Sequence, residues 1–153
     1  LYMKNVILSL VLFYCSFLSG QNGVLIPPDQ VVDAFSKKYP DRKAVWNLEY
    51  TGKKDDVTFE AKFSEKNKKT ALALSDQKGS FISYKLQIEM VELPVKAQAH
   101  IRKNYSVKSL KQSFSVLNAA NDKIYEASVI KDKKNYNLLF DKEGELIKRI
   151  LIR

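Results

Sequence analysis

Cysteine and histidine are almost absent from this 153-residue chain, which has one of each, Cys15 and His100. A zinc site needs three or four nitrogen, sulfur or oxygen ligands. Serine catalysis needs a base that a third group holds in place. The five glycines are not clustered, so no phosphate-cradling loop is present. The sequence therefore predicts no metal site, no cofactor and no catalytic site, and His100 is expected to be a partly exposed helix residue.

The N-terminus carries an uncharged apolar run that is too short to span a bilayer. Lys4 precedes the run from Val6 to Leu18, and two small residues follow it. A membrane span needs about 20 apolar residues, whereas the core of a signal peptide has roughly 7–15. We therefore predict a signal peptide over residues 1–20 and a secreted or periplasmic location. An uncleaved anchor and a lipoprotein attached at Cys15 are the alternatives, although Phe13-Tyr14 fit a lipoprotein site badly.

Removal of residues 1–20 would leave a chain without cysteine. Such a chain has no disulfide despite an oxidising destination, so its stability must come from packing.

The chain repeats itself at an offset of 66 residues. Tyr39 has its counterpart in Tyr105, and the strand-like segment Phe59-Glu60-Ala61 has its counterpart in Tyr125-Glu126-Ala127. A period of this length is typical of a duplicated supersecondary unit. We predict a first repeat over 21–92 and a second over 93–153, joined into one continuous structural domain because no linker separates them.

Each repeat begins with a short amphipathic helix, followed by four segments in which apolar residues alternate with polar ones. Helical spacing is seen in Val31, Phe35 and Tyr39, and again in Ala97, Ile101 and Tyr105. Alternation of period two indicates antiparallel strands with one covered and one open face. The fold class predicted is α+β, with tandem helix-plus-four-stranded antiparallel units and both helices on one sheet face. The residues expected on the covered face include Trp46, Phe59, Leu72, Leu74, Tyr84, Phe114, Val116, Tyr125, Leu138, Ile150 and Ile152.

Two Asp-x-x-Gly segments, Asp76 to Gly79 and Asp141 to Gly144, connect the last two strands of each repeat. Asp at the first position and Gly at the fourth favour a type I turn. A calcium loop is disfavoured because alternating oxygen ligands and a distal glutamate are missing.

Two surfaces are candidate binding sites. The first consists of apolar residues expected on the open sheet face, which are either ordinary surface residues or a partner interface: Val45, Phe81, Leu139, Ile147 and Leu151. The second consists of lysines on two equivalent hairpins, which could contact anionic ligands or simply keep the chain soluble, in a protein of formal net charge +9: Lys66, Lys68, Lys69, Lys131, Lys133 and Lys134. Because exposed aromatics do not accompany these lysines and export is predicted, no nucleic-acid partner is expected.

The two repeats share one pattern of residues. In the first repeat it consists of Pro28, Phe35, Lys37-Lys38-Tyr39-Pro40, Trp46, Phe59-Glu60-Ala61 and Asp76 to Gly79. The second repeat keeps Pro94, Ile101, Tyr105, Tyr125-Glu126-Ala127 and Asp141 to Gly144, but has Gln112 in place of the tryptophan and lacks the proline after Tyr105. This pattern resembles that of the PepSY-like small secreted proteins, which are also described as beta-lactamase-inhibitor-like for their fold. The resemblance covers about residues 26–153. It implies two helices on one face of an open sheet, and kinship of fold with proteins that bind and inhibit enzymes.

These observations lead to one functional hypothesis and one alternative. The hypothesis is an exported, non-enzymatic binding module that contacts a protein or peptide through its open sheet face. Such a module could act like an inhibitor of a peptidase or of another enzyme. The alternative is a basic envelope-associated protein that binds anionic glycans or lipid headgroups. Neither includes a membrane span after signal cleavage.

Overall fold

The computed structural model describes residues 25–50, 57–65 and 67–152. The predicted signal peptide and Lys66 lie outside these residues. Within them, α2 (Asp29–Lys38) precedes four strands: β1 (Val45–Tyr50), β2 (Val57–Ser64), β3 (Thr70–Ser75) and β4 (Phe81–Ile88). A short 3-10 turn, η1 (Met90–Glu92), leads into α3 (Val95–Asn104) and a second turn, η2 (Val107–Ser109). The chain then forms β5 (Leu110–Asn118), β6 (Lys123–Lys131), β7 (Lys134–Phe140) and β8 (Leu146–Ile152).

The strands form one eight-stranded antiparallel sheet, in which each strand pairs with its neighbour in sequence from β1 to β8. The α+β class and the antiparallel pairing are therefore confirmed. The sheet is larger than the predicted four-stranded unit, because β4 pairs directly with β5 from Ser83↔Asn118 to Ile88↔Ser113. The duplication and its boundaries at 21–92 and 93–153 stay predictions.

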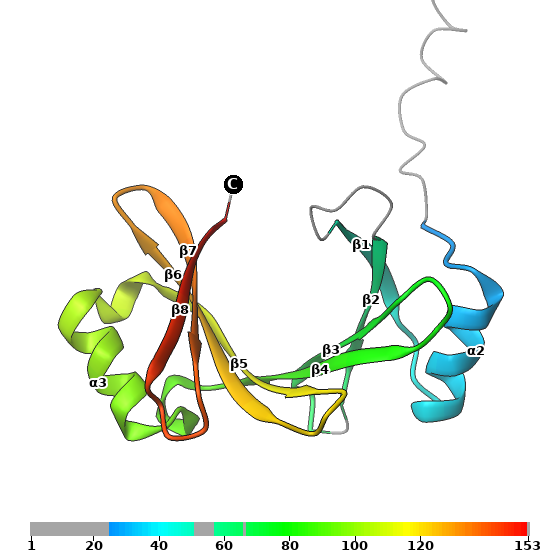
Figure 1. Cartoon of the computed structure of the whole chain (residues 1–153), viewed down its shortest axis with the longest axis horizontal. Coiled ribbons are helices and arrows are strands. Elements are labelled where there is room, and N and C mark those ends of the chain that lie inside the picture. Colours follow the sequence, from blue (N-terminus) through cyan, green and yellow to red (C-terminus); the bar gives the residue numbers. More distant parts are fainter. Residues whose placement is uncertain (1–24, 51–56, 66, 153) are drawn as a thin grey trace, which may run out of the picture.

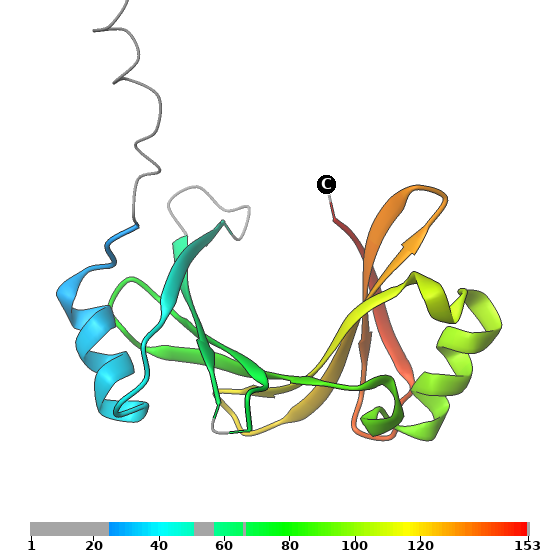
Figure 2. The ribbon, with the colours of Figure 1, turned by 180° about the vertical axis from the view of Figure 1, so that it is seen from behind.

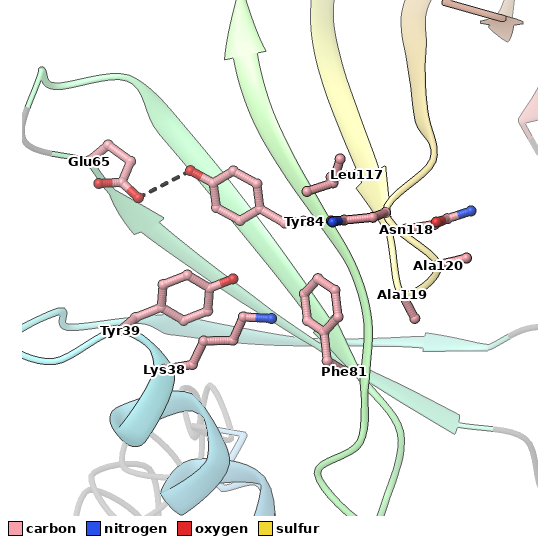
Figure 3. Close-up of a pocket in the computed structure, with 10 residues that line it drawn as sticks. Lys38, Tyr39, Glu65, Phe81, Tyr84, Leu117, Asn118, Ala119 and Ala120 are labelled. Carbon is pink, nitrogen blue, oxygen red and sulfur yellow. Dashed lines mark hydrogen bonds between the residues drawn. The ribbon is translucent and has the colours of Figure 1, made fainter.

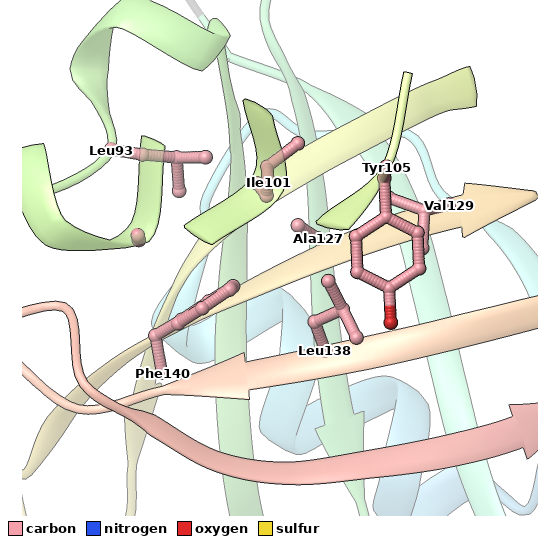
Figure 4. Packing of buried hydrophobic residues seen from close by; sticks show 8 residues of the cluster. Leu93, Ile101, Tyr105, Ala127, Val129, Leu138 and Phe140 are labelled. Carbon is pink, nitrogen blue, oxygen red and sulfur yellow. The ribbon is translucent and has the colours of Figure 1, made fainter. Parts of the chain in front are cut away.

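The two helices cover the same face of the sheet, one over each end. Phe35 of α2 packs against Ala61, Phe63, Ala71 and Ala73. At the other end, α3 packs its apolar stripe on β6 and β7, where the fully buried residues include Ile101, Leu138 and Phe140 (Figure 4).

Each end of the sheet has a turn glycine that lets a helix approach closely. Gly79 and Gly144 have φ of +80° and +88°, a backbone conformation that side chains disfavour. A Cβ atom at Gly144 would lie 2.7 Å from Pro94 Cβ and 2.8 Å from the backbone nitrogen of Ala97. The Asp-x-x-Gly segments are therefore turns on which the helix N-termini rest, with the Gly79 nitrogen donating to the Asp76 carbonyl at 3.1 Å.

The sheet is strongly curved (Figure 1). Its two ends rise on either side of β3, β4 and β5, and α2 and α3 lie on the outer flanks; the view from behind shows the same arrangement (Figure 2). The helix-free face is thus the concave one.

Several apolar residues lie on the opposite face from the one predicted. The register places Leu72 beside Lys85 and Phe114 beside Glu126, on the helix-free side. In β3 the small Ala71 and Ala73 face α2 instead, because a helix can approach a sheet closely only over small side chains. Register shifts at Leu110/Gln112 and at Leu139/Phe140 reverse the expected alternation in β5 and β8. The same correction applies to Leu74, Val116, Ile150 and Ile152.

Candidate functional site: a polar trough on the helix-free face

The concave face contains a trough of about 510 Å³ that crosses the sheet from β1 to β7. This volume falls within the range of ligand sites in proteins, but its lining is mostly polar. The residues that line it are Asn47, Glu49, Glu60, Lys62, Thr70, Leu72, Lys85, Gln87, Gln112, Phe114, Glu126 and Asn137. Neighbouring strands present these side chains in cross-strand pairs such as Asn47↔Glu60 and Gln87↔Phe114.

A buried ion pair forms the floor of the trough. Lys85 Nζ lies 3.0 Å from Glu126 Oε2, and the two side chains are 18% and 10% exposed. The second oxygen of Glu126 accepts a hydrogen bond from Asn137 Nδ2 at 2.9 Å, and Ser128 Oγ donates to Asn137 Oδ1 at 2.7 Å. Both carboxylate oxygens of Glu126 therefore have donors, which a buried charge requires.

The β1–β2 end of the trough is acidic. Glu60 Oε1 accepts a hydrogen bond from Asn47 Nδ2 at 3.2 Å, and Glu49 lies nearby. Partial burial raises the pKa of Glu49 above its usual range, and the charge of Glu60 raises it further, while Lys85 opposes both effects. The trough lining has three glutamates and two lysines in a chain whose net charge is +9. The trough lining thus has one more acidic than basic side chain, which favours cationic groups and amides as ligands.

The structure does not bring the five predicted apolar residues together. Val45 and Leu139 lie on the concave face, but on β1 and β7, across the breadth of the sheet. The predicted positions of Phe81 and Leu151 are wrong. The centroid of the Phe81 ring lies 3.2 Å from Lys38 Nζ of α2, on the helix-bearing side. Leu151 pairs with Tyr136 on that same side. Ile147 is 58% exposed and sits at the register shift of β8, with no cross-strand partner in the β7–β8 register.

The lysines of the second candidate surface lie on two hairpins that are far apart. The β6–β7 hairpin stands at the upper edge of the molecule in Figure 1, whereas the β2–β3 hairpin lies at its lower edge. Two of these lysines already have partners. Lys69 Nζ forms an ion pair with Glu92 Oε1 at 2.8 Å, and Lys131 Nζ donates a hydrogen bond to the Asn104 carbonyl at 3.3 Å. The described members, Lys68, Lys69, Lys131, Lys133 and Lys134, therefore do not form one patch.

His100 packs its ring edge-on against Phe140, with ring centroids 5.7 Å apart. Among the described residues, no three histidine, cysteine or acidic side chains are placed to hold a metal ion. In the same ranges, none of the helices has the length and apolar character needed to cross a bilayer.

Comparison with solved structures identifies proteins of the same architecture. A DUF2874 family protein from Bacteroides ovatus aligns with a TM-score of 0.65 at 20% identity, covering 83% of this chain and 89% of that chain. A candidate periplasmic protein from Bacteroides eggerthii aligns with a TM-score of 0.66 at 19% identity, covering 84% and 91%. A BLIP-like protein from Bacteroides fragilis aligns with a TM-score of 0.57 at 18% identity, covering 85% and 89%.

No protein-family model matches the chain, and no curated protein matches it. The PepSY-like designation is thus not confirmed. At these identities the solved structures establish a shared fold, and that fold is the beta-lactamase-inhibitor-like one.

Proposed function

We propose that this chain is an exported, non-enzymatic binding module that holds a segment of a protein or peptide in the trough of its helix-free face. The observation that carries the proposal is the trough itself. Seven strands contribute polar side chains to one concave surface, and neither helix covers it. Because this polar concave surface is left uncovered by the chain's own helices, we infer that it serves recognition.

The chemistry of the trough suggests what the bound segment presents. Glu49 and Glu60 offer carboxylates at one end, and amides such as Gln87 and Gln112 offer both donors and acceptors at the centre. A polypeptide loop with a lysine or arginine side chain matches this distribution of charge. The likeness of fold to a BLIP-like protein and to a candidate periplasmic protein supports a binding role outside the cytoplasm.

The charge of the trough gives the first test. The chain without residues 1–20 would be immobilised and exposed to a periplasmic extract of the source organism. The double variant Glu49→Lys/Glu60→Lys is expected to retain about tenfold less of the bound polypeptide, because two charge-assisted contacts become repulsive. The matched control is the Glu143→Lys variant. Glu143 is an exposed residue of the β7–β8 turn outside the trough, so this variant should bind as the wild type does.

The alternative function is decided by the same assay. Substitution of Lys133 and Lys134 by glutamate leaves the trough unchanged and reverses the charge of the β6–β7 hairpin. If this variant lost binding while Glu49→Lys/Glu60→Lys bound fully, the trough proposal would be overturned, and the hairpin lysines of the alternative would be the binding surface.

A further inference from the structure

A second cavity lies on the other face of the sheet, at the C-terminal end of α2. Its volume is about 690 Å³. Lys38 and Tyr39 form one side, Phe81 and Tyr84 of β4 form the base, and the segment from Leu117 to Asn121 forms the far side (Figure 3). It is separated from the trough by the thickness of the sheet, so it is a different site.

The walls of this cavity suit a flat apolar group. The rings of Tyr39 and Tyr84 are nearly parallel, at 19°, with centroids 6.0 Å apart. Phe81 lies with Tyr84 at the base, and Leu117, Ala119 and Ala120 add apolar surface on the far side (Figure 3). The Tyr39 and Tyr84 rings therefore stack on each other, and the aromatic surface that they leave free suits edge-to-face or offset contacts with an aromatic guest.

The charge available to a guest is positive. Glu65 is the acidic residue of the lining, and both of its oxygens are engaged: Tyr84 donates to Oε1 at 3.1 Å and Arg42 to Oε2 at 2.8 Å. Lys38 Nζ lies over the Phe81 ring and forms no ion pair within the described part of the chain.

The Tyr39 hydroxyl is a second donor. Among the described residues it has no hydrogen-bond partner, and Figure 3 shows it on the cavity side of the ring. Burial, and then the charge of Glu65, raise the pKa of Tyr39 to about 12, so the hydroxyl keeps its proton. Lys38 and Tyr39 thus present two donors to the same space.

The matching position at the end of α3 is closed. Tyr105 follows α3 as Tyr39 follows α2, but it is only 9% exposed. Lys131 lies over its ring at 5.3 Å from the centroid. Tyr105 is therefore closed over, whereas Tyr39, with Lys38 Nζ 6.0 Å from its ring centroid, borders an open cavity.

We propose that the cavity beside α2 binds an aromatic group that carries a carboxylate, with the ring against Tyr84 and Leu117 and the carboxylate on Lys38 and the Tyr39 hydroxyl. Two sources offer this chemistry: a free aromatic carboxylic acid, and the C-terminal phenylalanine or tyrosine of a peptide.

The test uses N-acetyl-phenylalanine as the probe and two-dimensional NMR of the isotopically labelled chain without residues 1–20 as the readout. Chemical-shift changes are expected at Tyr39, Phe81 and Leu117 to Asn121 and not in the trough. The Lys38→Gln substitution should lower the affinity for the probe about tenfold, because a charge-assisted hydrogen bond is lost. Lys37→Gln is the matched control, since it removes the same charge from the same helix outside the cavity.

The comparison of probes separates the possibilities. Binding of N-acetyl-phenylalanine amide as tight as that of the acid, or equal binding by the Lys38→Gln variant, would overturn the proposal. A peptide ending in phenylalanine that binds more tightly than the free acid would support a polypeptide terminus as the ligand. Equal binding of these two would support a small carboxylic acid.

Discussion

Replacement of Phe140 by alanine is expected to lower the free energy of unfolding by about 3–5 kcal/mol. Phe140 has no exposed surface, and it lies in the core cluster with Leu93, Ile101 and Leu138 (Figure 4). Its removal would leave a cavity between α3 and the sheet that rigid neighbours cannot fill. A domain of this size has a total stability of about 5–15 kcal/mol, so much of it would be lost.

Urea denaturation followed by circular dichroism measures this loss, and Leu146→Ala is the matched control. Leu146 pairs with Phe140 across β7 and β8 but is 39% exposed, so its truncation should cost less than about 1 kcal/mol. If both variants unfolded at similar urea concentrations, the packing of α3 described above would be wrong.

Replacement of Lys85 by methionine is expected to cost about 3 kcal/mol at neutral pH. The reason is that Glu126 would keep its charge and its burial but lose its cationic partner, retaining only the Asn137 amide.

The double variant Lys85→Met/Glu126→Leu separates the charge effect from simple loss of packing. It removes both charges, and its stability is expected to recover most of what Lys85→Met loses. Equal stabilities of the single and double variants in urea denaturation at neutral pH would show that the pair has no energetic role in the trough floor.

The features of the fold that were predictable are those set by local pattern. The spacing of Val31 and Phe35 gave the first helix, and alternation in β2 placed Ala61 and Phe63 correctly under it. The Asp-x-x-Gly segments gave two turns, because their physics depends on four consecutive residues. Direct pairing of β4 with β5, which makes one sheet of the whole, depends on contacts between the two halves of the chain, and no local pattern encodes it.

The trough was not predictable for three physical reasons. In β3 both faces are apolar, and the larger Leu72 and Leu74 were assigned to the core, although the helix needs the small Ala71 and Ala73 beneath it. In β5 the shift near Leu110 reverses the faces, so Phe114 lies beside Glu126 in the trough. Glu126 and Lys85 belong to different halves, and their ion pair depends on the direct pairing of β4 with β5, which no local pattern predicts. The one available signal in the sequence was Glu126 within the strand pattern Tyr125-Glu126-Ala127.

Site-specific photocrosslinking in cells tests the occupancy of the trough most directly. A photoreactive phenylalanine analogue would replace Gln112, an exposed residue of the trough, or, as the control, Lys103, an exposed residue of α3. A binding module of the proposed kind gives a defined polypeptide adduct from position 112 and none from position 103. Adducts from position 103 alone, or equal adducts from both positions, would contradict the assignment of the concave face as the binding surface.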